Sequence, residues 1–256
     1  MKRWTVFLYG VVSYAVFFLT FLYAAGFVGN FLVPKAMDSP ADGAPGTALA
    51  VNLALLGLFA LQHSGMARRS FKDWLARFLP EAAERSTYVL LSSAALLLLF
   101  AGWRPLGGVV WEVESPAGRA LLYGLFASGW LIVLLTTFLI DHFDLFGLRQ
   151  VWLYLRGRSY APLGFRTPGP YKLVRHPLYV GWLLAFWATP VMTATHLLFA
   201  LATTVYILGA IHFEEQDLVT AFGETYAEYR RRVPMLVPRF GKRSQEEAGA
   251  AAPRVA

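Results

Sequence analysis

The sequence predicts an all-α membrane protein, a polytopic helix bundle with about six transmembrane segments. Hydrophobic residues make up 57% of the chain and charged residues only 15%, whereas soluble domains carry about 25% charge. The mean hydropathy is +0.48. Apolar runs long enough for the roughly 20 residues that cross a bilayer as a helix recur along the chain, and polar loops separate them.

Four apolar segments are each long enough to form one span: residues 5–33, 47–66, 86–103 and 119–140. The first is longer than the apolar core of a signal peptide and lacks a small-residue cleavage site, so we expect it to be retained. A fifth apolar region, residues 178–213, is too long for one span and is interrupted at Pro190. We predict a helical hairpin here, with arms over residues 178–192 and 196–213. The first arm is short for a complete crossing.

Basic residues alternate between the loops. The loops before residue 5, between 66 and 86, between 140 and 178 and after 213 are rich in Lys and Arg, and the intervening loops are not. Because basic loops remain in the cytoplasm, the pattern predicts a bacterial inner-membrane protein with both termini cytoplasmic. Contact with an anionic lipid bilayer accounts for the net charge of +7. Nucleic-acid binding is not expected.

Composition also limits the chemistry and the domain organisation. The chain has no cysteine, which excludes disulfides and thiolate metal sites, and we expect no metal site. No G-x-G-x-x-G pattern follows a predicted strand, so a Rossmann cofactor site is excluded. We assign residues 1–243 to a single membrane-embedded domain that ends in a cytoplasmic amphipathic helix. The small and polar residues at 244–256 predict a disordered tail.

Polar residues concentrate in two segments that flank the predicted hairpin. One reads GPYKLVRHPLYVG from residue 169, and the other begins with EEQDL at Glu214. The hairpin returns the chain to the face it left, so Arg175 and His176 should meet Glu214 and Glu215 at one membrane boundary. A carboxylate at such a boundary needs a partner, and Arg175 is the natural one.

A helix projection places these carboxylates differently. If one helix continues through Gly223, Glu215 shares a buried face with Tyr226 and Tyr229, and Glu214 lies at the edge of that face. Two interpretations remain open. The segment is an interfacial amphipathic helix held by a structural Arg–Glu pair, or it forms a carboxylate and aromatic pocket for a sulfonium or ammonium cation.

An ordered pattern extends over residues 169–238: Arg-His-Pro-x-Tyr-x-Gly, the hairpin, then Glu-Glu-x-x-Leu-x-x-x-Phe-Gly-x-x-Tyr-x-x-Tyr. This signature resembles the isoprenylcysteine carboxyl methyltransferase family, whose relatives include the phospholipid N-methyltransferases and the NnrU-like proteins. The resemblance implies a pocket for S-adenosyl-L-methionine, enclosed by the hairpin and its flanks. The cofactor-binding residues it implies are Tyr171, Leu173, Val174, Arg175, His176, Pro177, Tyr179, Glu214 and Glu215.

Two further polar runs end predicted spans at the same face. They read QHSGMAR over residues 62–68 and DHFDLFGLRQ over residues 141–150. Helix termination at the lipid headgroups, with Gly65 and Gly147 as stops, is one explanation. Both runs also resemble segments of the bacterial methanethiol S-methyltransferases. That resemblance implies methylation of a small volatile thiol, methanethiol, to dimethyl sulfide.

Thiol methylation needs a thiolate, so a base near the donor methyl group is expected. The first candidates are His142 and Asp144, followed by His63 and then His176. The adjoining Asp141 and Asp144 are expected to raise the pKa of His142 by favouring its charged form.

Two alternatives to thiol methylation remain. The first is a methyltransferase that acts on a phospholipid amine or a prenylated carboxylate, which would need a lateral opening between spans. The second is a non-catalytic NnrU-like protein or a transporter. A transporter should carry charged or broken-helix features near the middle of the membrane, whereas the charges here gather at one face.

Overall fold

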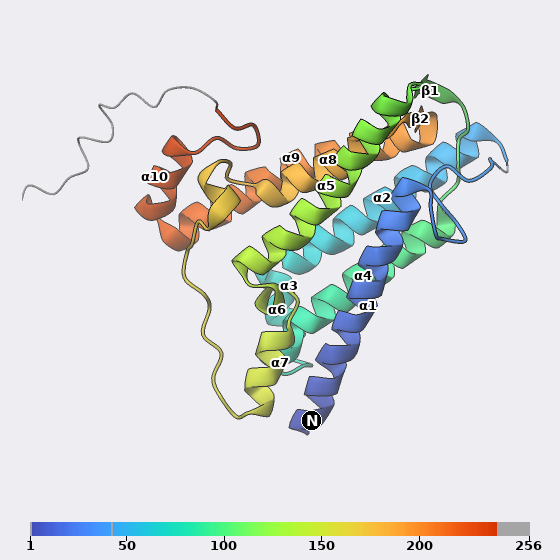
Figure 1. Ribbon diagram of the computed structural model, residues 1–256. Coiled ribbons are helices and arrows are strands. Elements are labelled where there is room, and N and C mark those ends of the chain that lie inside the picture. The colour runs from blue at the N-terminus through green and yellow to red at the C-terminus, as the bar shows by residue number, and fades with distance from the viewer. Residues whose placement is uncertain (1, 42, 240–256) are drawn as a thin grey trace, which may run out of the picture.

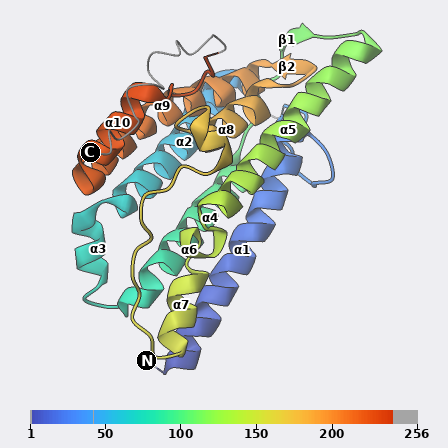
Figure 2. The same ribbon diagram turned by 60° about the vertical axis from the view of Figure 1, so that its left-hand side comes forward.

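The computed structural model describes residues 2–41 and 43–239; the predicted domain end at 243 and tail at 244–256 lie outside this part. Within it, five helices are long and apolar enough to span a membrane. They are α1 (Arg3–Gly29), α2 (Pro45–Ala67), α4 (Glu84–Gly102), α5 (Pro116–Ile140) and α9 (Ala194–Phe222). They run side by side as a bundle (Figures 1 and 2), in which α1, α2, α4 and α5 alternate in direction and α9 runs the same way as α5; this confirms the predicted polytopic helix bundle.

The first arm of the predicted hairpin is α8 (Pro177–Trp187), which has 11 residues and is too short to cross the membrane alone. It packs tightly against α5. A Cβ atom at Gly129 would lie 2.5 Å from the backbone nitrogen of Ala185, and one at Gly181 would lie 2.8 Å from the carbonyl oxygen of Gly129. The two glycines therefore allow the two backbones to touch, as small residues do between membrane helices.

Two short strands close one end of the bundle. β1 (Val109–Glu112) pairs antiparallel with β2 (Val191–Thr193), with Val109 opposite Thr193. We call this the strand end; it lies far from the N-terminus in Figure 1. The sequence analysis placed both segments in loops or in a hairpin arm and did not predict their pairing. β2 is also where the chain turns from α8 into α9.

A buried polar cluster ties the strand end together. The carboxylate of Asp38 accepts hydrogen bonds from the Thr193 hydroxyl and, at 2.7 Å, from the side-chain amide of Asn30. His196 is 1% exposed; its Nδ1 lies 3.4 Å from Asp38 and its Nε2 lies 2.9 Å from the carbonyl oxygen of Phe186. Burial alone would raise the pKa of Asp38, but hydrogen bonds and the charge of His196 outweigh burial and lower it.

The opposite end carries the N-terminus and most basic loops, and we call it the basic end (Figure 2). Short helices surround it. They are α3 (Arg69–Leu75), η1 (Glu81–Ala83), α6 (His142–Leu145), α7 (Leu148–Leu155), η2 (Gly169–Lys172) and α10 (Glu224–Arg232). Of these, α10 corresponds to the predicted amphipathic helix after the hairpin.

The continuous helix assumed in the projection is wrong. α9 ends at Phe222, and Gly223 adopts φ 55°, a conformation that favours glycine. The turn folds α10 back, so that Tyr226 and Tyr229 pack with Leu218 and Phe222 in one cluster. The predicted aromatic face therefore exists, but a sharp turn assembles it.

Candidate active site

The two motifs meet where α8, α9 and α10 come together. The Nε of Arg175 donates a hydrogen bond of 2.7 Å to Oε1 of Glu215, and Nε2 of His176 lies 3.1 Å from the same oxygen. The Nε of Arg230 lies 3.4 Å from Oε2. We call these four residues the Arg175 cluster. The Arg175 and Glu215 side chains are only 11% and 9% exposed, so the pair is buried and each charge depends on the other.

The segment after α10 closes over Arg175. Nη1 of Arg175 donates hydrogen bonds to the carbonyl oxygens of Arg230 at 3.0 Å and Val233 at 2.5 Å. Its backbone N–H donates to the carbonyl oxygen of Pro234 at 2.8 Å. The turn at Gly223 brings this segment back toward α8. The guanidinium therefore joins three parts of the chain, and Glu215 neutralises it.

Glu214 is more open than its neighbour. Its side chain is 46% exposed, its Oε2 accepts a hydrogen bond of 3.0 Å from the Tyr179 hydroxyl, and the same oxygen lies 3.9 Å from Nδ1 of His176. The His176 ring thus lies between Glu214 and Glu215. Burial, followed by the charge of Glu214, raises the pKa of Tyr171, so this phenol remains neutral. A half-open carboxylate among phenol rings suits a positively charged ligand.

The remaining residues of the predicted cofactor set differ in burial. Val174 is buried and Pro177 occupies the first turn of α8, where a missing N–H is tolerated. Leu173 is 61% exposed and takes no part in the contacts of the Arg175 cluster described above. Tyr229 donates a hydrogen bond of 2.6 Å to the carbonyl oxygen of Tyr171. Burial raises the pKa of Tyr229 to about 12, although Arg175 opposes this shift.

His63 lies in a second polar cluster, formed by α2 and α4. Its Nε2 is 2.8 Å from the Tyr88 hydroxyl, and its Nδ1 is 3.1 Å from Oγ of Ser92. The Phe59 ring stacks on the imidazole with centroids 5.1 Å apart. His63 therefore has one apolar face and an edge of hydroxyl groups, a setting in which a proton can be exchanged.

Three tyrosines bond the polar residues around His63 or Glu214: Tyr88 bonds His63, Tyr206 bonds Ser64 and Tyr179 bonds Glu214. The hydroxyl of Tyr206 on α9 is 3.1 Å from Oγ of Ser64, the residue after His63. Tyr179 donates a hydrogen bond to Glu214, and within the described residues no hydrogen bond joins Tyr179 to Tyr88 or Tyr206. We call Tyr88, Tyr179 and Tyr206 the tyrosine triad. The sequence analysis did not single out Tyr88 or Tyr206.

His142 and Asp144 belong to a separate network at the end of α5. The ring nitrogens of His142 lie 2.8 Å from the Tyr14 hydroxyl and 2.7 Å from the Thr137 hydroxyl. Asp144 forms an ion pair of 2.7 Å with Arg149. Over residues 2–41 and 43–239, no hydrogen bond or ion pair joins His142 or Asp144 to the Arg175 cluster or the tyrosine triad.

The expected rise in the pKa of His142 is wrong, because burial lowers it. The two neighbouring carboxylates face other groups. Asp141 accepts a hydrogen bond of 3.2 Å from the backbone N–H of Asp144 and so caps α6. Asp144 itself pairs with Arg149. Burial of the imidazole, which disfavours its charged form, therefore lowers the pKa of His142.

Comparisons with known proteins identify the family of the chain. The chain is 56% identical to the methanethiol S-methyltransferase of Crocosphaera subtropica, over 95% of this chain and 96% of that protein. It is 58% identical to methanethiol S-methyltransferase 2 of Bradyrhizobium diazoefficiens, over 96% and 95% of the two chains. It is 54% identical to the methanethiol S-methyltransferase of Mycobacterium tuberculosis, over 93% and 98%. The chain belongs to the methanethiol S-methyltransferase family.

The family model described as Phospholipid methyltransferase matches residues 123–225. No solved structure matches the chain. Membership of the methanethiol S-methyltransferase family confirms the predicted methyltransferase activity and requires a methyl donor. The matched region includes Arg175, Tyr179, Glu214 and Glu215, whereas His63 precedes it. The relatives, in contrast, cover nearly the whole chain, including α2 and α4.

Proposed function

We propose that the protein transfers a methyl group from S-adenosyl-L-methionine to methanethiol and so forms dimethyl sulfide at the basic end of the bundle. The observation that carries the proposal is the half-open Glu214, which is bonded to the Tyr179 phenol and suits a cationic donor. The bond between His63 and Tyr88 on the neighbouring helices supports His63 as a group that can take a proton. The names of the relatives support a small thiol as the acceptor.

The side chains around Glu214 fit a sulfonium donor. A carboxylate and phenol faces both attract a cation. The Tyr226 hydroxyl is buried, interacts electrostatically with Glu214 and Glu215, and has no hydrogen-bond partner within the described residues. Such a group is left for a polar part of a ligand. When bound, S-adenosyl-L-methionine supplies an electrophilic methyl group on a positively charged sulfur. His176 and Tyr179 orient it, and the Arg175–Glu215 pair holds their two segments together.

His63 is placed to take the thiol proton. The thiol sulfur forms a bond to the methyl carbon and loses its proton, while the electron pair of the broken carbon–sulfur bond remains on the donor sulfur. His63 lies 2.8 Å from the Tyr88 hydroxyl and 3.1 Å from Oγ of Ser92. His142 and Asp144 bond to other groups in a separate network. These contacts support His63 over His142 and Asp144 as the base, from which the proton passes to water.

We further infer that the basic end faces the cytoplasm of a bacterial inner membrane, with both termini on that side. The support is the concentration of Lys and Arg in the loops of this end, since basic loops are retained in the cytoplasm. The donor motifs and His63 then face the same compartment.

The test uses the purified full-length protein in detergent. Calorimetric titration should show binding of S-adenosyl-L-methionine, and headspace analysis should show dimethyl sulfide only when donor and methanethiol are both present. Phosphatidylethanolamine and a prenylated cysteine serve as competing acceptors. Methylation of either lipid in place of the thiol would overturn the proposed acceptor. Absence of donor binding by folded protein would overturn the proposal as a whole.

A further inference from the structure

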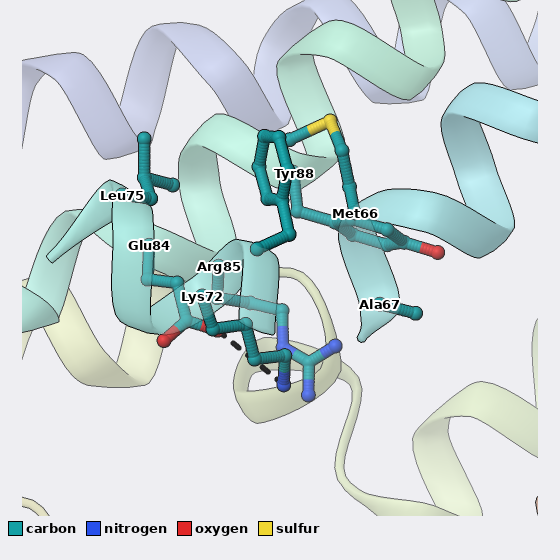
Figure 3. Close-up of a pocket in the computed structure, with 8 residues that line it drawn as sticks. Met66, Ala67, Lys72, Leu75, Glu84, Arg85 and Tyr88 are labelled. Carbon is teal, nitrogen blue, oxygen red and sulfur yellow. Dashed lines mark ion pairs between the residues drawn. The ribbon is translucent and has the colours of Figure 1, made fainter. Parts of the chain in front are cut away.

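A small cavity lies at the basic end between α2, α3 and α4, where Figure 3 shows Met66, Lys72, Leu75, Arg85 and Tyr88 around it. Its volume is about 50 Å³. A water-sized sphere needs roughly 10–15 Å³ on this scale, so the cavity holds about three to five such spheres. A thiol with two non-hydrogen atoms fits this space, whereas a prenyl chain or a phospholipid tail does not.

Tyr88 joins the cavity to the polar cluster that contains His63. Tyr88 lines the cavity and also bonds Nε2 of His63 at 2.8 Å. Met66 lines it too, and its sulfur accepts a hydrogen bond of 3.0 Å from Nε2 of Gln62. The Gln62 amide thereby fixes the position of the Met66 side chain in the wall of the cavity.

The charges at the cavity favour a thiolate. Lys72 and Glu84 form an ion pair of 3.4 Å across it, drawn as a dashed line in Figure 3. Arg85 is a second cation, with its guanidinium 6.0 Å from the centre of the Tyr88 ring. Two cations thus face one anion around a narrow space, and their combined field attracts a negatively charged sulfur.

We propose that this cavity admits and holds the small thiol, with Tyr88 and Met66 setting the size of the acceptor. The inference rests on the proposed thiol methylation. The extent of the sequence matches supports it, because residues 66–88 lie outside the 123–225 region matched by the phospholipid methyltransferase model. The relatives named for methanethiol cover these residues as well. Acceptor choice and donor binding thus belong to different parts of the chain.

The experiment compares kcat/KM for 1-propanethiol and for methanethiol in one preparation. Met66→Ala enlarges the cavity and should raise the propanethiol to methanethiol ratio at least about tenfold, since one methylene in an apolar pocket changes specificity by about 10–200-fold. Leu75→Phe narrows the cavity and should lower the ratio. Met192→Ala is the matched control, because Met192 is a fully buried methionine at the strand end and its replacement should leave the ratio unchanged.

The outcomes separate this inference from the proposed function. A ratio that stays constant in Met66→Ala and in Leu75→Phe, with donor binding intact, overturns the cavity as the acceptor site and leaves thiol methylation standing. A wild-type protein that methylates neither thiol defeats the proposed function itself. If Met66→Ala loses donor binding through misfolding, Leu75→Phe alone decides, because its ratio must fall for the inference to hold.

Discussion

Replacing the two adjacent glutamates one at a time should separate stability from donor binding. Glu215 accepts one hydrogen bond of 2.7 Å from Arg175 and has His176 at 3.1 Å. Each charge-assisted hydrogen bond contributes roughly 1.5–3 kcal/mol. Arg230 at 3.4 Å adds no more than about 1 kcal/mol, since its side chain is 52% exposed. Arg175 keeps its backbone carbonyl partners, so Glu215→Ala should lower the free energy of unfolding by about 3–5 kcal/mol.

Glu214→Ala should show the opposite pattern. Its side chain is 46% exposed and accepts one hydrogen bond, from Tyr179, so the stability loss should be below about 1 kcal/mol. Loss of the carboxylate should weaken donor binding by about 1–3 kcal/mol, which is roughly 5- to 150-fold. Glu224→Ala removes an exposed glutamate paired with Arg231 and should change neither quantity.

Two measurements on each variant test this division: unfolding in mixed micelles followed by circular dichroism, and titration with S-adenosyl-L-methionine by calorimetry. Wild-type stability in Glu215→Ala would refute the structural role assigned to the buried pair. Wild-type donor affinity in a folded Glu214→Ala protein would remove that carboxylate from the donor site.

Three further predictions concern the base, the strand end and the topology. An alkyl thiol has a pKa above the ~8.5 of cysteine, so with a resident base kcat/KM for methanethiol should level off by about pH 8 in wild type and His142→Gln. In His63→Gln, kcat/KM should keep rising about tenfold per pH unit. A plateau that is lost only in His142→Gln would assign the role of the base to His142. The pKa of Asp38 is lower in the folded protein than in the unfolded chain. The ionised carboxylate therefore stabilises the folded state at pH values above its unfolded pKa of ~3.9, and this contribution is lost as the pH falls through its folded pKa. Asp38→Asn should therefore be less stable than wild type at pH 7 and should lose less stability than wild type on acidification. An unchanged dependence of the free energy of unfolding on pH in the acid range would contradict this. Reporter fusions should read cytoplasm after Arg158 and the outer side after Glu112, and an outer-side signal at Arg158 would count against the proposed orientation.

The spans could be predicted because an apolar run is a property of the local sequence. The span predicted to end at residue 140 does end at Ile140. The pairing of β1 with β2 could not be predicted in this way, because it depends on two loops that the bundle brings together. The close packing of α8 on α5 likewise depends on Gly129 and Gly181 facing each other. Nothing near either glycine in the sequence indicates that.

The contacts around Arg175 were more predictable than those around His63. Opposite charges at one membrane boundary must pair, so the sequence predicted a partner for Arg175 in Glu214 or Glu215, and the structure pairs it with Glu215. The turn at Gly223 was left open, because the apolar periodicity continues through a residue that can also end a helix. Tyr88 and Tyr206 were missed for another reason: the chain has 12 tyrosines and 20 phenylalanines, so an aromatic residue in a span is not distinctive. Only their convergence in three dimensions gives them a role.

The position of the site within the chain bears on how the acceptor is chosen. The region matched by the phospholipid methyltransferase model begins at residue 123 and includes α8 and α9, which carry the buried Arg175–Glu215 pair and Glu214. The proposed donor site can be kept there while the acceptor changes, because His63 and Tyr88 lie on α2 and α4, outside the matched region. Substitutions along α2 and α4 should therefore alter the thiol that is used before they alter donor affinity. Substitutions in the Arg175 cluster should affect all acceptors alike.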